Sequence, residues 1–162
     1  MAENEDRGER LDRELMELLN GLRVVLPGIQ VLFAFLLTVP FTQRFGDLDS
    51  EQRAVFFAAF VCTAIASALL IAPSTYHRLR FRQRDKERLL RTANTLAIAG
   101  TAFLTAATTA AVFLVTDLVY DGPWTATVTA LFAGLVVWLW YGLPLWRRLR
   151  DSRQEPTAAP ES

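Results

Sequence analysis

Four long hydrophobic runs dominate the pattern of the chain, and charged segments separate them. The runs cover residues 22–41, 54–72, 92–116 and 124–146. Each has about the 20 residues that a helix needs to cross a hydrocarbon core of roughly 30 Å. Backbone groups in lipid must form hydrogen bonds within their own segment, so each run is expected to be helical. The pattern predicts an all-α, polytopic membrane protein with four transmembrane helices in a bundle.

A shorter amphipathic pattern precedes the first run. In residues 9–22, ERLDRELMELLNGL, leucines recur at helical spacing and charged side chains occupy the opposite face. This pattern predicts a short amphipathic interfacial helix, and the alternative is a cytoplasmic extension of the first span. Residues 1–8 and 151–162 have the composition of disordered tails. Residues 9–150 are therefore expected to form a single membrane domain.

Small and hydroxyl side chains mark the two central runs. The second run offers Ala58, Cys62 and Ala66. The third run carries two ridges at i+3 or i+4 spacing, which are Ala99, Ala102, Ala106 and Ala110, and Ala97, Thr101, Thr105 and Thr108. Small side chains let helices approach closely in lipid, so these two spans are predicted to form the packed centre of the bundle. A polar stripe along a pore is the alternative interpretation of the threonines.

Basic residues are segregated although the formal net charge is zero. The chain has 17 Lys and Arg residues. Four are in the N-terminal segment, seven in the second loop and four in the C-terminal tail, which leaves Arg44 and Arg53 in the first loop. Positive residues stay cytoplasmic, so both termini and the second loop are predicted to be inside. We therefore expect a multi-pass protein of the bacterial cytoplasmic membrane. A net charge of zero gives no indication of nucleic-acid binding.

Residues 72–86, APSTYHRLRFRQRDK, concentrate this inner charge. We expect its basic side chains to bind anionic lipid headgroups, with a binding free energy of about 1 kcal/mol per residue near a membrane surface. The basic residues are Arg78, Arg80, Arg82, Arg84 and Lys86. Asp85 and Glu87 interrupt the run, which argues against a nucleic-acid patch. His77 is a candidate proton relay, although its place beside a span end also suits a simple interfacial side chain.

The interiors of the four runs contain no Asp, Glu, Lys or Arg, the residues that usually mark a transport path. Gln30 follows Pro27-Gly28, which should kink the first span. Gln30, Thr101, Thr105, Thr108 and His77 outline a candidate transport path, and hydrogen bonding between helices is the simpler role for the amide. The single Cys62 and the scattered glycines complete no catalytic, metal or phosphate site, so no enzyme activity, metal or cofactor is expected.

Residues 17–45, ELLNGLRVVLPGIQVLFAFLLTVPFTQRF, the loop and span after them, and residues 72–86 carry a resemblance. Over about residues 14–120 the chain resembles a family of small bacterial integral membrane proteins of unknown function. Some members are labelled sodium:proton antiporter, but coupled cation and proton binding normally requires an intramembrane carboxylate. We expect an interaction or structural role in the membrane, with a homo-oligomer as its assembly. The alternative is a small ion transporter, a monovalent cation:proton antiporter that acts as an oligomer.

Overall fold

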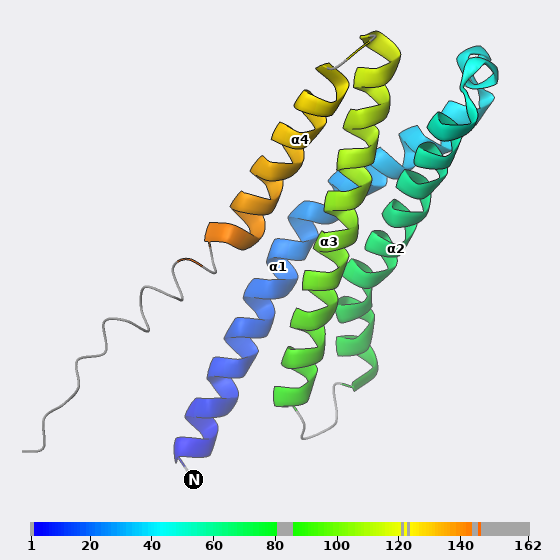
Figure 1. The fold of residues 1–162 in the computed structure, drawn as a ribbon. Helices are drawn as coiled ribbons and strands as arrows, with labels where there is room; N and C mark the ends of the chain where they lie inside the picture. Colours follow the sequence, from blue (N-terminus) through cyan, green and yellow to red (C-terminus); the bar gives the residue numbers. More distant parts are fainter. Residues whose placement is uncertain (1, 81–85, 121, 123, 144–145, 147–162) are drawn as a thin grey trace, which may run out of the picture.

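The computed structural model describes the chain except for residues 1, 81–85, 121, 123, 144–145 and 147–162. Its four long helices are α1 (Ala2–Thr38), α2 (Ser50–Arg80), α3 (Lys86–Val119) and α4 (Trp124–Val137) (Figure 1). Two 3₁₀ turns, η1 (Val39–Phe41) and η2 (Gln43–Asp47), connect α1 to α2. A π-helical turn, η3 (Trp138–Gly142), continues α4.

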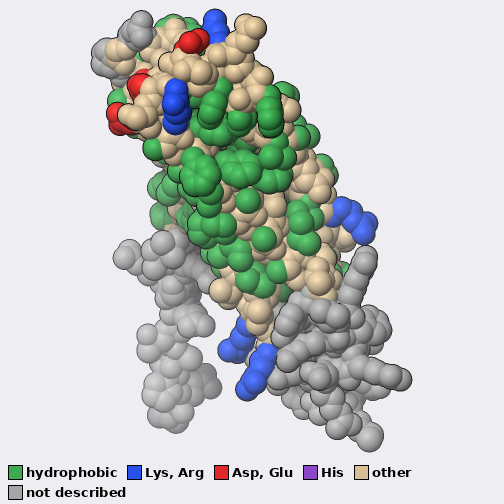
Figure 2. Space-filling model, turned by 90° about the vertical axis from the view of Figure 1, so that its right-hand side faces the viewer, with side chains coloured by type: hydrophobic (Ala, Val, Ile, Leu, Met, Phe, Trp, Pro, Cys, Tyr) green, Lys and Arg blue, Asp and Glu red, His purple; other side chains and the backbone are tan. Residues whose placement is uncertain are grey.

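Each of the four helices is long and apolar enough to cross a membrane. The candidate spans are Arg13–Phe41, Ser50–Thr75, Leu90–Val119 and Trp124–Gly142. The described part of the chain contains no strand. On the face shown in Figure 2, hydrophobic side chains cover the middle of the molecule and acidic side chains gather at one end. The prediction of an all-α bundle of four transmembrane helices is therefore confirmed.

The N-terminal prediction is wrong in one respect, because no separate interfacial helix precedes the first span. α1 is continuous from Ala2, so residues 2–8, predicted as a disordered tail, belong to this helix. The reason lies in its leucine face: Leu15 packs on Ala93 of α3, and Leu18 and Leu19 pack beside them. This apolar face is buried against a neighbouring helix, so it forms an extension of the first span. The predicted C-terminal tail, residues 151–162, lies outside the described residues.

Two prolines lie inside continuous helices. α1 runs through Pro27 and α2 runs through Pro73. Pro40 lies in η1, just beyond the last residue of α1, where the outer end of the first span was predicted. Pro73 is fully buried, and it lacks the N–H that would form one backbone hydrogen bond of α2. α2 nevertheless extends to Arg80, so much of the predicted second loop is helical.

The buried positions of the three packed helices follow a seven-residue repeat. In α1 they are Leu15, Leu22, Ile29 and Leu36. In α2 they are spaced three and four residues apart, at Phe56, Ala59, Thr63, Ala66, Leu70 and Pro73. In α3 they include Ala93, Gly100, Ala107 and Leu114. A repeat of seven is typical of helices that pack with a left-handed crossing, the usual arrangement of membrane bundles.

α2 and α3 form the centre of the bundle, as predicted, since they make the most extensive contact of any helix pair. Ala59, Ala66 and Ala107 are completely buried, which lets these two helices approach closely. The predicted alanine ridge of α3 is wrong in register, however, because Ala102 and Ala106 are exposed. All the candidate positions are small, so their size alone could not indicate which face is buried.

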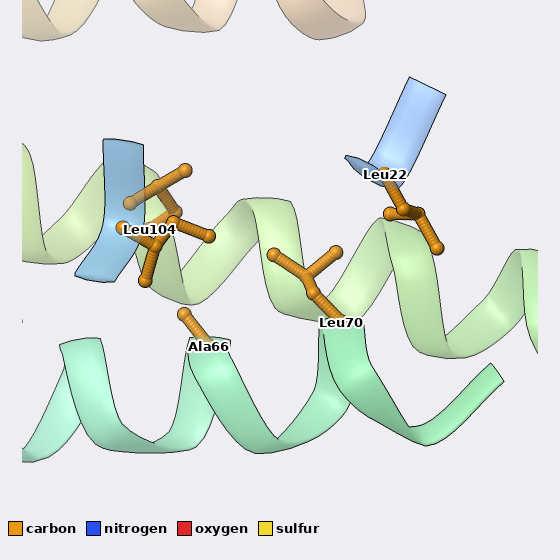
Figure 3. Close-up of a cluster of buried hydrophobic side chains, with 5 residues drawn as sticks. Leu22, Ala66, Leu70 and Leu104 are labelled. Atoms are coloured by element: carbon orange, nitrogen blue, oxygen red, sulfur yellow. The ribbon is translucent and has the colours of Figure 1, made fainter. Parts of the chain in front are cut away.

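α1 packs against both α2 and α3, whereas α4 packs against α3. The main core cluster joins three helices: Leu22 and Ile29 of α1, Ala66 and Leu70 of α2, and Leu104 of α3 (Figure 3). A second cluster lies nearer the α1–α2 connection, where Phe45 of η2 meets the ring of Phe56 edge to face at a centroid distance of 5.2 Å. α1 and α4 are mostly exposed along their spans, as expected of helices that face lipid.

Candidate functional site

The candidate site is a groove between α1 and the end of α2. It has a volume of about 370 Å³, and the described polar residues that line it are Asn20, Arg23 and Gln30 of α1 and Ser74 of α2. Side chains of Leu, Met and Pro also line it. Asn20, Arg23, Pro27 and Gln30 share one face of α1 because they recur every three or four residues. The groove therefore places a guanidinium and a side-chain amide on the same strip of helix.

Gln30 was predicted as the best polar candidate, and the structure places it in this groove, exposed. None of the three candidate threonines lines the groove. Arg23 lines the same groove about 10 Å along the helix from Gln30, so the groove carries a positive charge that disfavours a bound cation. The groove is therefore better suited to an anion than to a monovalent cation.

The threonines of α3 form hydrogen bonds to their own helix. The hydroxyl of Thr105 donates to the carbonyl of Thr101 at 2.9 Å, and that of Thr108 donates to the carbonyl of Leu104 at 2.9 Å. Such i−4 bonds satisfy the hydroxyl within the helix and leave it free to pack. Thr63 of α2, completely buried, does the same with the carbonyl of Ala59 at 2.8 Å. These contacts fit the interpretation of the threonines as a packing surface.

Thr101 also contacts α4. Its Oγ1 lies 3.2 Å from the hydroxyl of Tyr141, which in turn lies within 3.5 Å of the carbonyl of Ile98. Tyr141 belongs to the π-helical turn η3, in which Trp138 packs so closely on Gly142 that an added Cβ would lie 2.9 Å from its ring. This hydroxyl pair is a polar connection between α3 and the end of α4 that the sequence did not indicate.

A second polar connection missed from the sequence joins α2 to α3 at the opposite end of the bundle. The side-chain amide of Gln52 donates from Nε2 to Oδ2 of Asp117 at 2.8 Å. Gln52 and Asp49 also form a reciprocal cap of α2: the Gln52 N–H donates to Asp49 Oδ1 at 2.8 Å, and the Asp49 N–H donates to Gln52 Oε1 at 3.2 Å. The sequence D-x-x-Q at residues 49–52 is the signal that could have predicted this cap.

The arginine-rich segment is only partly within the described structure. Arg82 and Arg84 lie outside the described residues. The backbones of His77, Arg78 and Arg80 belong to α2 and that of Lys86 begins α3, while their side chains lie outside the described part. The binding of these side chains to lipid, and a role of His77, therefore stay predictions. Among the described residues, no group of three His, Cys, Asp or Glu side chains is arranged to hold a metal ion.

A family model described as a family of unknown function (DUF6328) matches residues 4–144, which is most of the chain. The chain belongs to this family. The match extends the resemblance seen in the sequence to all four helices of the DUF6328 fold, the fourth included. No curated protein and no solved structure matches the sequence.

Proposed function

We propose that this protein has an interaction or structural role in the bacterial cytoplasmic membrane and that it is not an enzyme. The observation that carries this proposal is the composition of the packed centre. Between α2 and α3 the fully buried side chains are Ala59, Thr63, Ala66, Leu70 and Ala107, which are apolar or bonded to their own helix. A transport path usually requires ionisable side chains at this depth. Their replacement by close packing supports a structural role.

The proposed orientation places both termini and the α2–α3 connection in the cytoplasm. It rests on the fifteen basic residues of the three inner segments against Arg44 and Arg53 on the other side. A charge at the bilayer centre costs about 2.5–3.5 kcal/mol, so seven basic residues hold the second connection firmly in water. The inner surface would then contact anionic headgroups, and the exposed faces of α1 and α4 would contact acyl chains or a second copy of the chain.

Topology mapping and a flux assay test the two parts of the proposal separately. A reporter enzyme that is active only outside the cytoplasm should be inactive when fused after Arg84 and active when fused after Asp47. The reverse pattern would overturn the orientation.

Purified protein in liposomes should produce no sodium or proton flux beyond that of empty liposomes under either gradient. A flux that Gln30→Ala abolishes would instead establish the transporter alternative.

A further inference from the structure

The groove between α1 and α2 combines one positive charge with an apolar wall. Its volume of about 370 Å³ is within the range of sites for small molecules, about 300–1,000 Å³. Of the described residues that line it, Arg23 is charged and none is acidic. A guanidinium offers donors in a planar fork that fits two oxygens of a phosphate group. The charge and shape of this groove are therefore complementary to a phosphate-containing anion.

Pro27 adds a second recognition element beside Arg23. It lines the same groove and has no N–H with which to donate to the backbone carbonyl of Arg23, four residues earlier in the helix. Such a carbonyl in a membrane helix requires a donor from elsewhere. A ligand that carries hydroxyl groups next to its phosphate satisfies both the guanidinium and the carbonyl of Arg23.

The surface of α1 becomes less polar beyond the groove. Gln30 follows Arg23 by seven residues, about 10 Å along the helix. Beyond it, Ala34 continues the same face of α1 and lines a second groove of about 240 Å³ together with the exposed side chains of Val31 and Phe35, which are turned partly away from that face. The order of groups is thus a cation, an amide and then an apolar strip, which matches the phosphate, the ester groups and the acyl chain of a phospholipid. A free phosphate ion would leave the apolar part of this surface unused.

We propose that this groove binds one anionic phospholipid, with phosphatidylglycerol as the best-fitting headgroup. Arg23 binds the phosphate, the headgroup hydroxyls donate to the Arg23 carbonyl, and Gln30 donates to an ester oxygen. The acyl chain lies along α1 over Val31 and Phe35. The assignment of this lipid to the inner leaflet rests on the proposed orientation, whereas binding itself does not.

Native mass spectrometry of the full chain in detergent, titrated with phosphatidylglycerol or phosphatidylcholine, tests the proposal. We expect one phosphatidylglycerol per chain, bound at least about fivefold more tightly than phosphatidylcholine, and an approximately tenfold loss of affinity in Arg23→Gln. Arg13→Gln is the matched control, because Arg13 is exposed on the same helix and does not line the groove. It should retain affinity within about twofold. Equal losses in the two variants, or no preference between the two lipids, would overturn the proposal.

Two further variants separate a local site from a general effect on folding. Arg23→Lys keeps the charge but not the planar fork, so it should retain the preference for phosphatidylglycerol with weaker binding. Ser74→Phe fills the groove from α2 without a change in charge and should reduce binding as strongly as Arg23→Gln. Unchanged binding in Ser74→Phe would place the lipid elsewhere. Displacement of the lipid by millimolar inorganic phosphate would show a phosphate-ion site and would also overturn the proposal.

The outcomes are independent of the orientation experiment. An outward second connection would move the groove to the outer leaflet and leave the binding data intact. If the lipid-binding measurements overturn the proposed site, the proposed topology is not affected.

Discussion

Gly100 of α3 is the position where a single added methyl group should disturb the bundle most directly. A Cβ at this position would lie 2.6 Å from Cγ and 2.9 Å from Cδ2 of Leu70, and 3.3 Å from Cβ of Leu69. Non-bonded carbon atoms are most stable at about 3.5–4.0 Å. The nearest of these atoms is the branch point of a side chain that is completely buried, so Leu70 cannot swing away. Gly100→Ala therefore requires α2 and α3 to separate.

The expected magnitude follows from two opposing effects. Overpacking of a well-packed core typically costs about 1–3 kcal/mol, and an overlap of about 1 Å with a buried branch point favours the upper part of that range. Replacing Gly by Ala within a helix stabilises the helix by about 1 kcal/mol, because Ala has the higher helix propensity. We therefore expect Gly100→Ala to lower the free energy of unfolding by about 1–2 kcal/mol.

The assay is reversible unfolding of the purified chain in mixed micelles, titrated with a denaturing detergent and followed by tryptophan fluorescence. Gly134→Ala is the matched control, since Gly134 lies within α4 and an added Cβ there has no atom within 4 Å. This control should be neutral or more stable by up to about 1 kcal/mol.

A double-mutant cycle with Leu70→Ala identifies the clash as the cause. Leu70→Ala alone should cost about 2–5 kcal/mol, as for other buried leucines. In that background Gly100→Ala should destabilise much less, because the two nearest atoms, Cγ and Cδ2 of Leu70, have been removed and only Cβ of Leu69 at 3.3 Å remains close. If Gly100→Ala proves as stable as Gly134→Ala, or if its cost persists without Leu70, close approach of α2 and α3 at this point is not what holds the centre together.

Two further effects should appear in the same unfolding assay. Gln52→Ala and Asp117→Ala should each destabilise by about 1–3 kcal/mol, because they break a hydrogen bond to a charged group, and the double variant should lose less than the sum; full additivity would show that the contact contributes nothing. Tyr141→Phe should cost about 0.6 kcal/mol, the usual value for a hydrogen bond between membrane helices. It should cost less in a Thr101→Ala background, where the hydroxyl keeps only its contact with the carbonyl of Ile98; an equal cost in both backgrounds would contradict the Thr101–Tyr141 contact.

The two polar contacts between helices, Gln52–Asp117 and Thr101–Tyr141, could not be predicted from the sequence. Asp117 directly follows the third hydrophobic run, and it accepts a hydrogen bond from Gln52, 65 residues earlier in the chain. Likewise, Tyr141 lies near the end of the fourth run, and its hydroxyl contacts Thr101 on α3. Both pairs join residues whose proximity depends on the angle at which the helices cross and on how far one helix is shifted along its axis relative to the other. Neither quantity leaves a local pattern in the sequence.

The sequence by itself determined that this protein lies in a lipid bilayer, how many spans it has and that they are helical. A bilayer requires long apolar segments whose backbone hydrogen bonds form within the segment. It also determined the segregation of basic charge from which an orientation is proposed. Only the tertiary structure decided which face of each helix is buried. Apolar residues surround these helices on every side, so the seven-residue repeat through Leu22, Ile29 and Leu36 could not be distinguished from the lipid-facing positions between them. In water, hydrophobicity marks the buried face of a helix. In lipid both faces are apolar, and the fit between side chains determines which face is buried.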